Sequence, residues 1–347
     1  MKLPSDSSLS RKDFLRLTTG ILSGLGIPGV TSAADAGRAE PLGEHYLTQG
    51  LTAMARAQTW FDAHWGAGIL AGYYLCRDHP LDAATVAGIR QQMDTVLKVR
   101  AEQFSPMKEG AVEEKHIAEV TEALRPAMQG GLRAHGHAVI FAALATRALR
   151  DAPQMARAVI TEPLCGLSRQ IVKLKPQKPA PGAQGYVGTQ AMIEATFDSI
   201  ARFQSLLGHP EIRRPNFTHM ITHTEALMSL EQMGFANLAR AGHAGHRAHI
   251  SAPVPTVPGT AATGDHQRVL ESVMNGSFWS DAANKARWQE RWNETSNPNG
   301  DWIASGHLFK VLYSYHRLMS RVGDPDKVKI CTAILLERYL NPAVRGG

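Results

Sequence analysis

The sequence predicts an all-α fold, a helical toroid or bundle built from weakly repeated helical hairpins. Apolar residues recur at helical spacing, as in residues 69–74 and 139–144, and this period is typical of amphipathic helices. Strands that alternate apolar and polar residues around a tight turn are not found in the sequence. Four apolar segments also begin with histidine, which suggests that one helical unit recurs along the chain.

The first 36 residues predict an export signal. Residues 10–16 read SRKDFLR, and Arg11-Lys12 stands where a twin-arginine signal has two arginines. A mildly apolar segment follows over 17–30, and Ala34-Asp35-Ala36 resembles a signal-peptidase site. The resemblance to this signal class implies that the twin-arginine machinery exports the folded protein to the periplasm. Proteins exported in this way often load a cofactor first.

Residues 37–347 are expected to form a single all-α domain. The hydrophobic fraction of 44% supplies a core, and no later apolar stretch has the length of about 18 residues that suggests a membrane span. The net charge is +6, but basic residues are scattered among acidic ones. We therefore expect neither a nucleic-acid partner nor a stable membrane span.

Two segments rich in proline and glycine interrupt the helical pattern, at 175–188 and 251–264. They are either surface linkers or loops that fold over a cleft. Cys76, Cys165 and Cys331 are far apart in the sequence. They are either three buried reduced thiols or one disulfide and one free thiol.

The four histidine-led segments locate the expected site. They begin at Ala63, Ala134, Thr218 and Ser305, and their leading histidines are His64, His135, His219 and His307. If the four helices run in the same direction, these histidines, together with His137 and His223, meet at one end of the bundle, which we call the mouth. The positive ends of helix dipoles keep histidine neutral there. Neutral histidine binds metals and accepts protons.

A transition metal at the mouth is one hypothesis, with His137, His219 and His223 as its ligands. His219 and His223 are four residues apart and share a helix face. His135 and His137 diverge on a helix and share a site only at a helix cap or in a loop. The H-E-x-x-H motif of zinc peptidases is absent from the sequence.

The histidine-led helices distantly resemble the questin oxidase-like family of helical proteins. The resemblance rests on four segments, which are AHWGAGILAGYYL with His64, AHGHAVIFAALATRAL with His135, THMITHTEALMSL with His219, and GHLFKVLYSYHRL with His307 and Lys310. It implies an oxidoreductase, since family members are associated with oxidative ring opening of polycyclic aromatic ketones. It also implies that these histidines and Lys310 are the catalytic residues.

The leading hypothesis is an exported oxidoreductase of the monooxygenase kind, acting on a small planar or cyclic organic substrate. One histidine of the mouth abstracts a proton, and Lys310 or a second histidine stabilises an oxyanion. A second hypothesis is a periplasmic protein that binds a metal or ligand without turnover. A third is a lyase or hydrolase on the same scaffold, with the four tryptophans between 279 and 302 binding a sugar.

Overall fold

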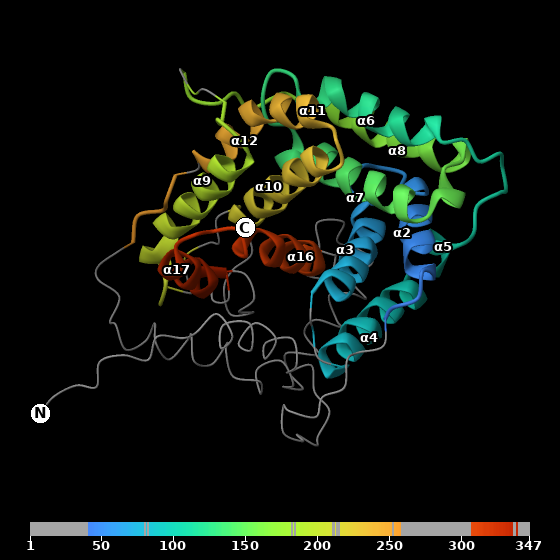
Figure 1. Ribbon diagram of the computed structural model, residues 1–347, viewed down its shortest axis with the longest axis horizontal. Coiled ribbons are helices and arrows are strands. Elements are labelled where there is room, and N and C mark those ends of the chain that lie inside the picture. Colours follow the sequence, from blue (N-terminus) through green and yellow to red (C-terminus); the bar gives the residue numbers. More distant parts are fainter. Residues whose placement is uncertain are drawn as a thin grey trace, which may run out of the picture.

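The computed structural model describes residues 41–79, 81, 83–181, 183, 185–209, 212, 216–251, 253–257, 307–335 and 338 (Figure 1). The predicted signal peptide and the tryptophan-rich segment 279–302 lie outside the described residues. The all-α prediction is confirmed, because the described residues contain thirteen α-helices and no strand. The toroid of repeated hairpins stays a prediction.

The helices of the described residues follow one another with short connections. Their bounds are α2 His45–Ala55, α3 His64–Asp78, α4 Ala83–Val99, α5 Ala101–Phe104, α6 Lys115–Met128, α7 His137–Asp151, α8 Ala158–Val172, α9 Thr189–Ala201, α10 Phe217–Gln232, α11 Ala236–Ala241, α12 His243–Ile250, α16 Leu308–Met319 and α17 Pro325–Leu335. Three 3₁₀ turns lie at Ala134–Gly136, Pro153–Met155 and Arg202–Leu206. No described helix is both long enough and apolar enough to cross a membrane.

Four central helices position the site. Helix α3 contacts α7 and α16, and α10 contacts the same two helices. In α10 every residue from Phe217 to Leu230 is buried, and in α16 every residue from Leu308 to His316 is buried. A helix buried on all sides needs apolar or small residues all round, and both sequences supply them. The remaining helices pack outside this group, with α6 and α8 beyond α7, and α9 and α17 beyond α10 and α16 (Figure 1).

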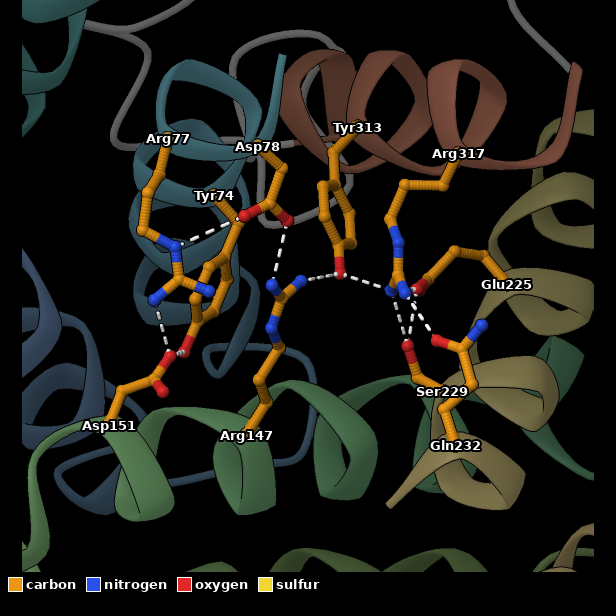
Figure 2. A network of polar contacts seen from close by, with 10 residues as sticks. All are labelled: Tyr74, Arg77, Asp78, Arg147, Asp151, Glu225, Ser229, Gln232, Tyr313 and Arg317. Atoms are coloured by element: carbon orange, nitrogen blue, oxygen red, sulfur yellow. Dashed lines mark hydrogen bonds and ion pairs between the residues drawn. The ribbon is translucent and has the colours of Figure 1, made fainter. Parts of the chain in front are cut away.

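The four central helices run in the same direction, because like ends meet at both ends of the group. Their first turns carry the clustered histidines described below. Their last turns meet in the polar network of Figure 2. This network contains Tyr74, Arg77 and Asp78 from α3, Arg147 and Asp151 from α7, Glu225, Ser229 and Gln232 from α10, and Tyr313 and Arg317 from α16. Three arginines suit this end because the carboxyl ends of helices carry partial negative charge.

Tyr313 stands at the centre of the network. Its hydroxyl oxygen accepts hydrogen bonds from Arg147, at 2.5 Å, and from Arg317, at 2.8 Å. Arg147 also pairs with Asp78 at 2.7 Å. Arg317 pairs with Glu225, which is buried. Burial is the largest cause that raises the pKa of Tyr313, so the phenol keeps its proton although two guanidinium groups contact it.

The cysteines and the proline-rich loops complete the comparison with the sequence. Cys76, Cys165 and Cys331 are all free thiols, with Cys165 and Cys331 buried and Cys76 half-buried. The described residues of 175–188 and of 251–257 lie outside helices. Residues 258–264 of the second predicted loop lie outside the described residues.

The ion pair between Arg317 and Glu225 is expected to contribute strongly to stability. Replacing Arg317 by Ala leaves the Glu225 carboxylate buried without its cation, and this typically costs about 3–5 kcal/mol. Urea unfolding followed by circular dichroism measures the loss. The matched control is Arg125→Ala, which breaks an exposed pair with Glu122 and should cost about 1 kcal/mol or less. Equal losses in the two variants would contradict this role of the network.

Candidate metal centre

The structure brings the histidines of the four central helices together at their amino ends. His64 and His137 are the first residues of α3 and α7. His219 lies in the first turn of α10, and His307 immediately precedes α16, with Lys310 one turn later. The parallel course of the helices thus places four imidazoles from four distant segments at one mouth.

Direct contacts join the four rings. The Nε2 atoms of His64 and His137 are 2.8 Å apart, and those of His219 and His307 are 3.2 Å apart. The ring of His307 stacks on that of His64, with 4.5 Å between centroids. The ring of His219 lies 4.7 Å from that of His137. His64, His137 and His307 each offer a ring nitrogen within 4.8 Å of the other two, an arrangement that suits a metal ion.

The other nitrogen of three of these rings is held by an oxygen three residues earlier in the chain. His64 Nδ1 lies 2.5 Å from the Phe61 carbonyl oxygen. His137 Nδ1 contacts the Ala134 carbonyl oxygen, and His219 Nδ1 contacts the Asn216 side-chain oxygen. An oxygen of this kind only accepts, so each Nδ1 carries the hydrogen.

The proton positions leave lone pairs facing one another. A neutral imidazole with hydrogen on Nδ1 has its lone pair on Nε2, so the Nε2 atoms of His64 and His137 are two acceptors at 2.8 Å. Two acceptors do not form a hydrogen bond, and a cation between them satisfies both. Metal-bound histidines almost always donate their second N–H to a carbonyl, carboxylate or water. The donor set and its supporting oxygens therefore fit a metal ion.

Burial keeps this cluster neutral. It lowers the pKa of His64, His137 and His307 well below the ordinary value, and it is the largest cause for each. Burial also lowers the pKa of Lys310, which is 2% exposed. The charge of Lys310 in turn lowers the pKa of the three histidines. Neutral imidazole, expected from the helix dipoles, is thus favoured chiefly by desolvation.

The predicted ligand set is only partly brought together. His137 belongs to the convergent group of three, and His219 contacts both His137 and His307. His223, one turn further along α10, contacts His249 instead, with 3.2 Å between their Nδ1 atoms. The spacing of four along one helix did not decide the ligand set, because neighbouring helices supply nearer partners for His219.

His135 lies at the solvent edge of the cluster. It is exposed, and its ring stacks on that of buried His219 with 5.2 Å between centroids. Ala134, His135 and Gly136 have φ angles of 43°, 52° and 82°, a left-handed turn that ends where α7 begins. Each non-glycine residue there costs about 1–2 kcal/mol, and such strain concentrates at functional sites. This cap is what lets His135 and His137 reach one site.

The turn also brings α10 close to α7. A Cβ atom on Gly136 would lie 2.8 Å from the His223 ring carbon Cγ. Only glycine tolerates both this approach and the positive φ. The loop at 175–188 reaches the same region through Tyr186. The Tyr186 hydroxyl lies 2.6 Å from His246 Nδ1, and its backbone N–H donates to His243. Of the two expectations for this loop, the fold over the histidine region is the one observed.

Several residues of the site are not evident from the sequence. Trp60 and Phe61 pack beside the cluster, with Trp60 5.1 Å from the His137 ring and Phe61 4.7 Å from the His64 ring. The ring of Phe141 meets His64 edge-on and lies 5.4 Å from Lys310 Nζ. The supporting carbonyls of Phe61 and Ala134 carry no sequence signal, because every residue type has one.

Comparison with known proteins gives no match, since no protein-family model, no curated protein and no solved structure is significantly similar to the chain. The site is therefore interpreted from its own geometry.

The buried histidines predict that stability falls as the pH falls. The pKa of His316 is lowered to about 3 by burial, and the pKa of its neighbour His79 to about 4. The unfolded chain takes up protons below pH 6.5 while these folded groups do not, so stability is full above 6.5 and declines below it. His316→Phe should make the decline between pH 6 and 4 shallower by about 1.4 kcal/mol per pH unit. Urea unfolding across that range checks this, and parallel curves for the two proteins would contradict it.

Proposed function

We propose that the protein is an oxidoreductase that holds a transition metal with His64, His137, His219 and His307. The single observation that carries the proposal is the pair of Nε2 lone pairs of His64 and His137, which face each other at 2.8 Å. Such an arrangement is costly without a cation, because each buried acceptor is left without a donor. The Nε2 contact between His219 and His307 extends the ligand set to four.

The donor set selects the class of metal. Among the described residues, no carboxylate forms an ion pair with any of the four histidines. Imidazole ligands suit iron, copper, nickel and zinc, whereas calcium and magnesium require oxygen ligands. A redox-active ion of this group supplies electron transfer to or from a bound organic substrate. The resemblance to the questin oxidase-like family favours the same reaction class.

Lys310 and the aromatic side chains complete the proposed site. Because its pKa is lowered by burial, the Lys310 amine has a neutral fraction that accepts a proton at Nζ from the substrate. Its charged form stabilises an oxyanion. Trp60 is half-buried beside His137 and offers a ring face to a planar substrate. These contacts support a small planar or cyclic molecule as the substrate.

The second candidate function is metal binding without turnover. One observation favours it, which is that His64, His137, His219 and His307 are each at most 4% exposed. A catalytic metal usually keeps an open coordination position, and a fully enclosed one does not need it. Metal-dependent oxidation of an organic substrate by the purified protein would separate the two functions.

The metal is expected at about one ion per chain in the protein purified from its native host. Elemental analysis by inductively coupled plasma mass spectrometry measures it. His64→Ala and His137→Ala should each lose most of the metal, because they remove opposite sides of the 2.8 Å contact. The matched control is His316→Ala, which removes a buried histidine of α16 outside the cluster and should retain the metal. Wild-type protein without a transition metal would contradict the proposal.

We also propose export to the periplasm through the twin-arginine machinery, on the sequence of residues 10–16. Changing Arg11 to Lys removes the remaining arginine of the pair and should abolish export. Lys12→Arg restores the usual pair and should preserve export or increase it. Cell fractionation and immunoblotting measure the periplasmic share, and unchanged export of Arg11→Lys would contradict the assignment.

A further inference from the structure

A second pair of histidines lies beside the proposed metal centre and has no role in it. His223 of α10 and His249 of α12 contact each other through their Nδ1 atoms at 3.2 Å. Their exposed fractions are 2% and 6%. Neither ring nitrogen Nε2 has a hydrogen-bond partner in the described part of the protein. Two buried polar atoms of adjacent side chains are thus left without partners.

The protons of the pair can be counted. Burial lowers the pKa of His223 to about 3 and that of His249 well below its ordinary value, so both rings are neutral. In the Nδ1 contact, one ring donates and the other accepts. The donating ring has a bare lone pair on Nε2, and the accepting ring has its hydrogen on Nε2. The pair therefore presents one buried donor and one buried acceptor.

The neighbouring histidine shows that such atoms are normally satisfied here. His246 Nδ1 lies 2.6 Å from the Tyr186 hydroxyl, and its Nε2 lies 2.7 Å from the Thr224 hydroxyl oxygen. Both nitrogens of His246 are bonded, although its ring is only 5.8 Å from that of His223. A buried polar group without a partner costs about 1–3 kcal/mol. The deficit at His223 and His249 thus points to a bound molecule.

The pair is continuous with the metal centre and with solvent. The exposed ring of His135 stacks on His219, at 5.2 Å, and lies parallel to His249, at 6.2 Å. The left-handed turn at Gly136 brings the His223 ring against the start of α7. A molecule that enters past His135 therefore meets the proposed metal ligands on one side and the histidine pair on the other.

We propose that His223 and His249 form a substrate subsite that binds a neutral organic molecule through one hydroxyl and one carbonyl group. The carbonyl accepts from the N–H of one ring, and the hydroxyl donates to the lone pair of the other. An ionic ligand is disfavoured because burial without an opposite charge is costly. A second metal is disfavoured because, among the described residues, only His64, His137 and His307 form a convergent group of three.

This inference deepens the proposed function and rests on it, since the subsite orients the molecule toward the metal centre. The probes are the three isomers of hydroxyacetophenone, compared with acetophenone, phenol and ethylbenzene. Isothermal titration calorimetry on the purified metal-containing protein measures each dissociation constant. At least one hydroxyacetophenone should bind about tenfold tighter than acetophenone and than phenol, because each missing group leaves one buried nitrogen without a partner. Ethylbenzene should bind most weakly.

Variants test whether the pair is responsible. His249→Phe keeps an aromatic ring and removes both nitrogens, so the preference for hydroxyacetophenone should fall to less than about threefold. The matched control is His316→Phe, which alters a buried histidine pair with His79 elsewhere and should keep the preference. Should His249→Phe not fold, the six probes on the wild-type protein still decide.

The outcomes separate this inference from the proposed function. Equal binding of all probes, which ordered water at the two nitrogens would produce, overturns the subsite. Absence of measurable binding by every hydroxyacetophenone, or an unchanged preference in His249→Phe, overturns it as well. Metal content is measured in parallel and should not change in His249→Phe. Selective binding by a protein without metal would support the subsite and contradict the metal centre.

Discussion

The hydrogen bond from a histidine Nδ1 to an oxygen three residues earlier is the interaction on which the site depends. It occurs at the starts of α3, α7 and α10, where Phe61, Ala134 and Asn216 supply the oxygen. Each bond fixes the tautomer and the orientation of its ring, so the lone pairs on Nε2 point into the centre of the cluster. The parallel course of the central helices makes this local device converge. An antiparallel neighbour would carry its histidine to the opposite end.

The two ends of the central helices solve opposite electrostatic problems. At the amino ends, neutral histidines and a buried lysine with a lowered pKa fill a region of partial positive charge. At the carboxyl ends, guanidinium groups pair with carboxylates around the Tyr313 hydroxyl (Figure 2). The amino end is costly to fold without a ligand, since its polar atoms face one another. The satisfied network at the other end contributes stability that offsets this, as is common for proteins with strained sites.

The histidines divide into groups by how their nitrogens are satisfied. His246 is bonded at both nitrogens and holds Tyr186, and with it the loop at 175–188. His64 and His137 are bonded at one nitrogen and direct the other at the proposed metal. His223 and His249 are bonded to each other and direct the remaining nitrogens at the proposed subsite. Burial removes the charge from all of these rings, so hydrogen bonding, not net charge, distinguishes their roles.

The sequence by itself determined the all-α fold and the cluster at the helix starts, because both follow from local periodicity and from the histidine that opens each apolar segment. It also indicated that His135 and His137 share a site only at a helix cap, which is where they lie. The tertiary structure decided which histidines meet. His219 and His223 looked equivalent on one helix face, yet α16 supplies His307 to the first and α12 supplies His249 to the second. The exact partners depend on how helices from distant segments pack, and the supporting carbonyls belong to the backbone, which is the same at every residue.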